Sequence, residues 1–348
     1  MLKKILSIIL CLSFFTLNFA SCKNKGEPKT QTKSYYEYFD TVSVIFSYKG
    51  DSEDEFESNC SAVENILSEY HKLFDIYYEY SGINNLMTVN KNAGKSPVKV
   101  DGRLIEFLLF CKEMYSLTDG KTNIAAGAVL KLWHDCRDKA ENNPAGAETP
   151  DESELLAASA HCDIDNLIID EEAGTVYISD PDMSLDVGAI GKGYATEKAA
   201  NTLISRGVSS YVLNIGGNIR AIGTRIDGDG WLTGITHPDK SSDEQFIRKV
   251  NIKNTSLVTS GDYERYYTVD GVDYHHIIDP LTLMPADYFS SVSIFTEDSG
   301  IADALSTALF CMSYEDGLKL VESIAGVDVI WVDKEFNVRM TDGIEIAD

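Results

Sequence analysis

The sequence predicts an α/β fold in which flanking helices cover mixed sheets, formed as one large domain. Segments with the apolar spacing of helices alternate with short runs rich in β-branched and aromatic residues, which are typical of strands. Removing a leader of 21 residues from the 348 leaves 327, enough for a substantial hydrophobic core. No linker within residues 35–348 is clear enough to mark a domain boundary.

Apolar periodicity assigns most of the chain to helices and strands. Helices are predicted over 54–74, 103–117, 125–133 (as a helix or a buried turn), 196–206 and 301–312. Strands are predicted over 36–49, 167–169, 176–178, 211–215, 231–236, 247–252, 255–260 and 290–295. Residues 137–154 contain two prolines and several acids and are interpreted as an excursion over the surface. Asp298 or Ser299 is expected to cap the helix at 301–312.

The N-terminus has the features of a bacterial lipoprotein leader. Lys3 and Lys4 precede a mostly apolar run, residues 5–17, that is too short to span a membrane comfortably. Phe19-Ala-Ser-Cys22 fits a lipobox, so we expect cleavage before Cys22 and lipidation of its thiol; a plain secretory signal is the alternative. The predicted organisation is a signal peptide at 1–21, a flexible tether at 22–34 and a folded domain at 35–348, anchored at the extracytoplasmic (periplasmic) face of the cell membrane.

The charge and the cysteines exclude several classes of protein. A net charge of −25 and a pI near 4.5 argue against nucleic acid as a partner. Beyond Cys11 and Cys22 there are five cysteines, and no two have the spacing of a zinc site or a redox motif. Three of them lie in apolar surroundings and are predicted to be core residues: Cys60, Cys111 and Cys311.

The stretch 185–195, Leu-Asp-Val-Gly-Ala-Ile-Gly-Lys-Gly-Tyr-Ala, is interpreted as the end of a strand, a glycine turn and the start of a helix. The free N–H groups of that helix, together with Lys192, would attract an anion, and Asp186 would accept hydrogen bonds from a ligand or anchor the loop. The spacing matches neither a P-loop nor a dinucleotide fingerprint. A plain turn between a strand and a helix remains the alternative.

Asp270-Gly271 predicts a two-residue hairpin turn, which places Arg265 opposite His276 and Tyr267 opposite Tyr274 on one face. A cation, an imidazole and two phenols on one face suit a polyanion better than a core. Either histidine of the pair 275–276 is otherwise an exposed strand residue.

Asp303 and Thr307 lie four residues apart on the helix at 301–312 and therefore share a face. A carboxylate and a hydroxyl are hard oxygen ligands, and a glycine-turn carbonyl with phosphate oxygens would complete a magnesium site. The alternative is that Asp303 is an ordinary acid in the first turn of a helix.

Taken together, six motifs resemble those of the FAD:protein FMN transferases, the ApbE-type flavin transferases, and occur in the same order. They are Cys22 of the lipobox and the segments 185–193, 214–218, 259–265, 276–280 and 302–308. The resemblance covers about residues 35–348. It implies an α/β flavin-binding fold that uses magnesium to split FAD, joins FMN through a phosphoester to a Thr or Ser of an extracytoplasmic redox protein, and releases AMP.

The resemblance also implies roles for individual residues. It implies magnesium ligation by the Ala189 carbonyl, Asp303 and Thr307, and catalysis by His276 as base with Arg265 close by. The residues implied as FAD contacts are Phe39, Lys121, Thr122, Asn123, Asp186 and Lys192.

Two segments depart from the family pattern. Phe39-Asp-Thr41 stands where relatives commonly have Met-Gly-Thr, and Gly120-Lys-Thr-Asn-Ile-Ala125 stands where they commonly have Gly-Ala-Phe-Asp-x-Thr. Two other functions therefore stay open: a magnesium-dependent FAD pyrophosphatase and a non-enzymatic flavin-binding lipoprotein. The implied partners are FAD, the membrane through the lipid anchor, and a flavin acceptor such as a subunit of a sodium-pumping quinone reductase.

Overall fold

The computed structural model describes residues 30–48 and 51–347. The predicted signal peptide and Cys22 lie outside the described residues, as does the tether up to residue 29. Thr30–Tyr35 forms a strand paired with Ser43–Tyr48, so residues 30–34 of the predicted tether belong to the central sheet. This Thr- and Lys-containing segment pairs through its backbone at the edge of the sheet.

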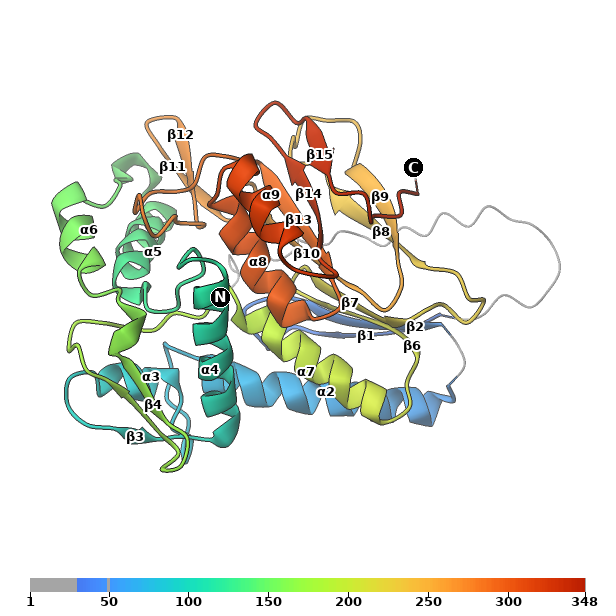
Figure 1. Cartoon of the computed structure of the whole chain (residues 1–348), viewed down its shortest axis with the longest axis horizontal. Helices are drawn as coiled ribbons and strands as arrows, with labels where there is room; N and C mark the ends of the chain where they lie inside the picture. The colour runs from blue at the N-terminus through green and yellow to red at the C-terminus, as the bar shows by residue number, and fades with distance from the viewer. Residues whose placement is uncertain (1–29, 49–50, 348) are drawn as a thin grey trace.

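An eight-stranded antiparallel sheet forms the centre of the molecule (Figure 1), in the order β1-β2-β6-β7-β10-β13-β14-β15. Its strands are β1 (Thr30–Tyr35), β2 (Ser43–Tyr48), β6 (Ser210–Ile215), β7 (Asn218–Gly223), β10 (Ser256–Gly261), β13 (Ser291–Thr296), β14 (Asp328–Val332) and β15 (Val338–Met340). Apolar side chains alternate between the two faces: Leu213 packs on one side, and Val212 belongs to the core on the other.

Helices cover one face of this sheet. They include α2 (Glu53–Phe74), α7 (Gly191–Ser205), α8 (Ser299–Phe310) and α9 (Tyr314–Glu322). A capping box of Ser52 and Glu55 fixes the start of α2. The Asp298 carboxylate accepts from the N–H groups of Gly300 and Ile301, so Asp298 is the cap of α8.

A two-stranded ribbon covers the other face. It consists of β8 (Trp231–Thr236) and β9 (Phe246–Ile252), which pair antiparallel. Trp231 and Val250 pack with Leu257 and Phe295 of the central sheet in a separate apolar cluster. Both faces of the central sheet are therefore buried, which explains why its strands carry apolar side chains on both sides.

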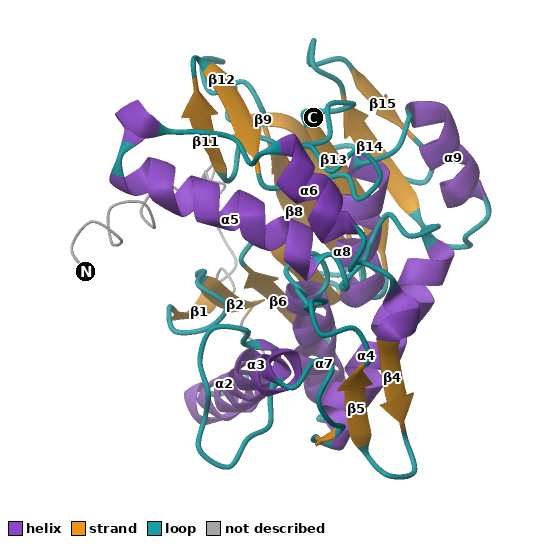
Figure 2. Ribbon diagram, turned by 90° about the vertical axis from the view of Figure 1, so that its left-hand side faces the viewer, coloured by secondary structure: helices purple, strands orange, loops and turns teal. Residues whose placement is uncertain are grey.

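The remaining elements lie at one end of the sheet (Figures 1 and 2). They are α3 (Leu86–Lys91), α4 (Gly102–Leu117), α5 (Gly127–Asn142), α6 (Glu152–Ser159), the sheet of β3 (Val98–Lys99), β5 (Thr175–Ile178) and β4 (Leu167–Asp170), two short 3-10 turns at Pro144–Gly146 and Ile164–Asn166, and the hairpin of β11 (Tyr266–Val269) and β12 (Val272–His275). The predicted α/β fold with mixed elements and flanking helices is confirmed.

Residues 137–154 lie at the surface as predicted, and most of them are exposed, but they are more regular than expected, because α5 continues to Asn142 and α6 follows from Glu152. Two other local predictions were wrong. Residues 36–42, predicted as part of a strand, form the connection between β1 and β2. No strand directly precedes the glycine segment at 188–193; a single bridge from Ser184 to Ala126 stands in its place.

Among residues 30–48 and 51–347, none of the helices combines the length and the apolar character needed to cross a membrane.

Candidate functional site

The site is built where the amino end of α7 meets α8. The backbone N–H of Gly193 donates to Oδ2 of Asp303 at 2.7 Å, across 110 residues of sequence. A Cβ on Gly193 would lie 2.2 Å from the Ser299 carbonyl oxygen and 2.4 Å from the Asp303 Cβ. The glycine therefore serves close helix packing, not a left-handed turn, and the anion at this helix terminus is a side chain of the protein itself.

The Asp303 carboxyl is buried, with 5% of the residue exposed. Burial raises its pKa above the ordinary value, although the Lys192 ammonium and the Gly193 amide favour the ionised form. Lys192 is held nearby, since its Nζ donates to Oδ1 of Asn218 at 3.3 Å. A buried carboxylate whose pKa stays raised despite these groups is suited to a cation ligand.

The other two predicted metal ligands, Thr307 and Ala189, each have an oxygen atom that is available to a metal ion. Within the described ranges, neither the Thr307 hydroxyl nor the Ala189 carbonyl oxygen takes part in a hydrogen bond. Thr307 lies one turn after Asp303 on α8, and Ala189 lies four residues before Gly193. Three hard oxygens of this kind fit a magnesium ion.

A buried ion pair fixes the start of α8 against α7 and the sheet. Oε2 of Glu197 accepts from the Ser299 N–H at 3.0 Å and from Nε of Arg220 at 3.1 Å. Burial raises the pKa of Glu197, and Arg220 opposes that shift. This arrangement of Glu197, Arg220 and Ser299 was not predicted from the sequence, because the three residues belong to three different elements.

His276 lies at the end of the β11–β12 hairpin, whose register matches the prediction. Tyr267 pairs with Tyr274, and the N–H of His276 donates to the Arg265 carbonyl at 3.0 Å. The His276 Nδ1 is 3.2 Å from the same carbonyl oxygen. Burial, followed by the Arg265 and Lys192 charges, lowers the pKa of His276 to about 3. Lys192 thus acts on the pKa of His276 as well as on that of Asp303.

The two phenols of the hairpin do not form the predicted open polar face. Tyr267 is buried and Tyr274 stacks on Trp133 of α5 with ring centroids 6.0 Å apart, because α5 covers this side of the hairpin. The same packing brings His134 and Arg137 to a narrow cleft shared with His276. Sequence reasoning missed both residues, since the helix was predicted to end at Trp133 and no local signal in the chain pointed to the cleft.

Asp186 anchors the loop that precedes α7. Its N–H donates to the Ile124 carbonyl at 2.8 Å, and its Oδ1 accepts from the Gly188 N–H at 2.9 Å. Asp186 raises the pKa of His134, against a larger lowering by burial, and contributes to the raised pKa of Tyr77. It thus both anchors the loop and acts on the charge of a histidine that lines the cleft.

The four FAD contacts implied at the departing segments have partners within the protein. Lys121 forms a buried ion pair with Asp279, with Nζ 2.9 Å from Oδ1. The Thr122 hydroxyl donates to the Ala304 carbonyl at 2.7 Å, and Nδ2 of Asn123 donates to the Cys162 carbonyl at 2.9 Å. Phe39 has a φ of 55° and its ring meets those of His71 and Phe74. Their contact with FAD stays a prediction.

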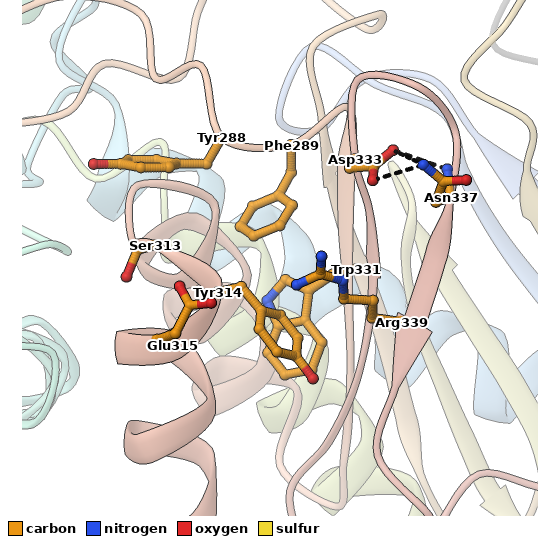
Figure 3. Close-up of a pocket in the computed structure, with 9 residues that line it drawn as sticks. All are labelled: Tyr288, Phe289, Ser313, Tyr314, Glu315, Trp331, Asp333, Asn337 and Arg339. Carbon is orange, nitrogen blue, oxygen red and sulfur yellow. Dashed lines mark hydrogen bonds between the residues drawn. The ribbon is translucent and has the colours of Figure 1, made fainter.

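A pocket of about 340 Å³ opens elsewhere, between α9 and β14 (Figure 3). Its floor includes Trp331, and the Arg339 guanidinium lies 4.6 Å from the Tyr314 ring centroid. It contains none of the predicted site residues. This pocket therefore lies apart from the carboxylate, the lysine and the histidine described above.

Comparison with known proteins decides the family. The model of the ApbE family matches residues 39–331, a range that includes Phe39, His276 and Thr307. The chain belongs to the ApbE family. It is 36% identical over 276 residues to an FAD:protein FMN transferase of Treponema pallidum, covering 74% of this chain and 73% of the relative. It is 30% identical over 286 residues to one of Klebsiella pneumoniae, covering 82% and 85% of the two chains.

Solved ApbE structures have the same fold. The ApbE protein of Thermotoga maritima superposes with a TM-score of 0.78 at 27% identity, covering 90% of this chain and 97% of its own. A flavin transferase ApbE from Vibrio cholerae superposes with a TM-score of 0.73 at 24% identity over the same shares. The antiparallel sheet with its flanking helices is therefore the ApbE fold.

Proposed function

We propose that this ApbE-family chain transfers FMN from FAD to a Thr or Ser hydroxyl of an acceptor protein and releases AMP, in a magnesium-dependent reaction. One observation carries the proposal: the charge of Lys192 acts both on the buried Asp303 carboxylate and on His276. A cation-binding carboxylate next to fixed positive charge suits the cleavage of a diphosphate. The names of the similar proteins support the choice of FAD and protein as substrates.

Asp303, Thr307 and the Ala189 carbonyl would hold the magnesium ion. When bound, the ion would neutralise charge on the diphosphate oxygens. Lys192 contributes a second positive charge that Asn218 keeps in place. Glu197 and Arg220 hold the first turn of α8, so that Asp303 keeps its position relative to Gly193.

His276 is arranged as a base for the acceptor hydroxyl. Its Nδ1 faces the Arg265 carbonyl, which can only accept, so Nδ1 carries the proton and Nε2 is left free to take one. In the reaction the hydroxyl oxygen bonds to the FMN phosphorus, the bond from that phosphorus to the bridging oxygen breaks, and the hydroxyl proton passes to Nε2. The bridging oxygen leaves with AMP.

We also propose that the chain acts at the extracytoplasmic face of a bacterial membrane, lipid-anchored through Cys22. The basis is the lipobox and the apolar run before it. The acceptor would be a redox protein exposed on the same side of the membrane.

The test is chromatography of FAD incubated with the purified protein and magnesium, with and without an acceptor that carries a Thr flavinylation site. AMP released only with the acceptor, and FMN bound to it, is the expected result. AMP with free FMN in both tubes would instead identify a pyrophosphatase. Intact FAD in both tubes would identify a flavin carrier.

A further inference from the structure

Helix α5 presents two nitrogen-bearing side chains to the cleft beside His276. His134 and Arg137 are three residues apart on α5 and therefore lie on one face of the helix. Both line the cleft that His276, Tyr267 and other residues complete. Figure 2 shows α5 next to the β11–β12 hairpin.

Neither side chain has a strong hydrogen-bond or ion-pair partner among the described residues. The His134 ring makes no hydrogen bond to any residue in the described part of the chain. Arg137 has an ion pair with the adjacent Asp138, at 3.6 Å, and that aspartate is 68% exposed. A guanidinium has five N–H donors, so one loose and solvent-exposed pair leaves most of them available.

The charges around this cleft contrast with those of the whole protein. The chain carries a net charge of −25. The Arg137 and Arg265 guanidinium groups nevertheless act together on His134, and Arg265 and Lys192 act together on His276. The acids acting on His134 are Asp186 and Asp138. Cations and acids are therefore balanced around His134, in contrast to the net negative charge of the whole chain, and the charges that act on His276 are cationic. Cationic groups of this kind attract an anionic ligand.

The cleft itself is narrow, with a volume of about 10 Å³, which is about the space of one water molecule. An anion larger than water must therefore lie across its mouth. Tyr267 lines the cleft, and its buried hydroxyl has no hydrogen-bond partner among residues 30–48 and 51–347. The hydroxyl marks a polar atom at which a water molecule bound with the ligand is expected.

We propose that His134 and Arg137 bind the diphosphate of FAD from the α5 side of the cleft that they share with His276. This assignment rests on the proposed function and adds α5 residues to its substrate site. The Arg137 guanidinium would contact phosphate oxygens in a bidentate manner, and His134 would donate one hydrogen bond.

The experiment measures the binding of three probes by calorimetry: FAD, ADP and riboflavin. ADP carries the diphosphate without a flavin, and riboflavin carries the flavin without a phosphate. Arg137→Met is compared with Lys139→Met, which removes the same charge from an exposed position on the same helix. We expect Arg137→Met to bind FAD and ADP roughly ten-fold more weakly than the wild type, with riboflavin and Lys139→Met unchanged. His134→Gln, which keeps an N–H donor, is expected to have a smaller effect.

Unchanged affinity of Arg137→Met for FAD and ADP would overturn the assignment. Equal weakening of all three probes would overturn it too, because Arg137 would then support the flavin site or the local fold. A wild type that binds FAD but transfers no FMN would refute the proposed function and leave this assignment standing on the binding data. A wild type that binds neither FAD nor ADP would refute both.

Discussion

The backbone amide of Gly193 donates to the buried Asp303 carboxylate at 2.7 Å and so joins the first turn of α7 to α8. The contact depends on the missing side chain, because a Cβ would overlap the Ser299 carbonyl oxygen. It sets the place of Asp303 relative to the preceding loop, from which the Ala189 carbonyl comes. The candidate metal site and the packing of two helices are therefore one feature.

Gly193→Ala tests this packing. The added methyl group forces α7 and α8 apart, and we expect a loss of about 1–3 kcal/mol in the free energy of unfolding, together with weaker magnesium binding. Denaturant unfolding and calorimetry measure the two effects. Gly102→Ala is the control, since no atom lies within 4 Å of its Cβ position, and it should be neutral or stabilising by up to about 1 kcal/mol. A Gly193→Ala variant as stable as the wild type would contradict the close approach.

Asp303→Asn is expected to stabilise the metal-free protein while reducing AMP release at least roughly 100-fold. The pKa of Asp303 is raised in the folded state, so its carboxyl group favours folding only when protonated. That contribution is complete below the unfolded pKa and is lost as the pH rises through the folded pKa. At pH 7 the ionised carboxylate therefore costs stability, which an amide relieves. Thermal unfolding with and without magnesium checks this: the metal should raise the Tm of the wild type alone.

His276→Ala is expected to retain FAD binding and to lose roughly 100-fold or more in FMN transfer, as for removal of a general base. The pKa of about 3 also predicts the pH profile. A base must be unprotonated, so the acid limb of kcat/KM that belongs to His276 should lie well below pH 5. A limb near pH 6.5 that disappears in the variant would contradict the lowered pKa of this imidazole. His237→Ala, at a histidine that contacts Phe336, is the control.

Lys121→Met is expected to destabilise the protein by about 3 kcal/mol or more, because it leaves the Asp279 carboxylate buried without its partner. The double variant Lys121→Met/Asp279→Asn should recover most of this loss, since an amide oxygen can still accept from the Leu281 N–H. FAD affinity is measured in the double variant. Recovered stability with normal FAD affinity indicates a structural lysine, whereas recovered stability with weak FAD binding indicates a direct contact.

Local rules predicted what depends on neighbouring residues. Asp270 and Gly271 both have positive φ, at 50° and 82°, and the hairpin therefore has the predicted register with Arg265 opposite His276. The start of α8 followed in the same way from Asp298 as its cap. Cys60, Cys111 and Cys311 are buried as their apolar neighbours indicated.

The contacts of the site that the sequence did not predict depend on packing between segments far apart in the chain. The glycine segment was interpreted as a turn, but Gly193 meets a helix that begins more than a hundred residues later. Lys121 finds its partner across 158 residues. His134 and Arg137 became part of the candidate site only because the hairpin packs on α5. None of these relationships has a local signal in the chain.

The central claim is tested most directly by the intact mass of a flavin-acceptor domain after incubation with this protein, FAD and magnesium. We predict a gain of one FMN per acceptor with the wild type, and no gain with Asp303→Asn or when magnesium is chelated. An acceptor of unchanged mass in the presence of the active wild type would contradict the proposed transfer. A full gain with Asp303→Asn would contradict the metal-binding role of that carboxylate.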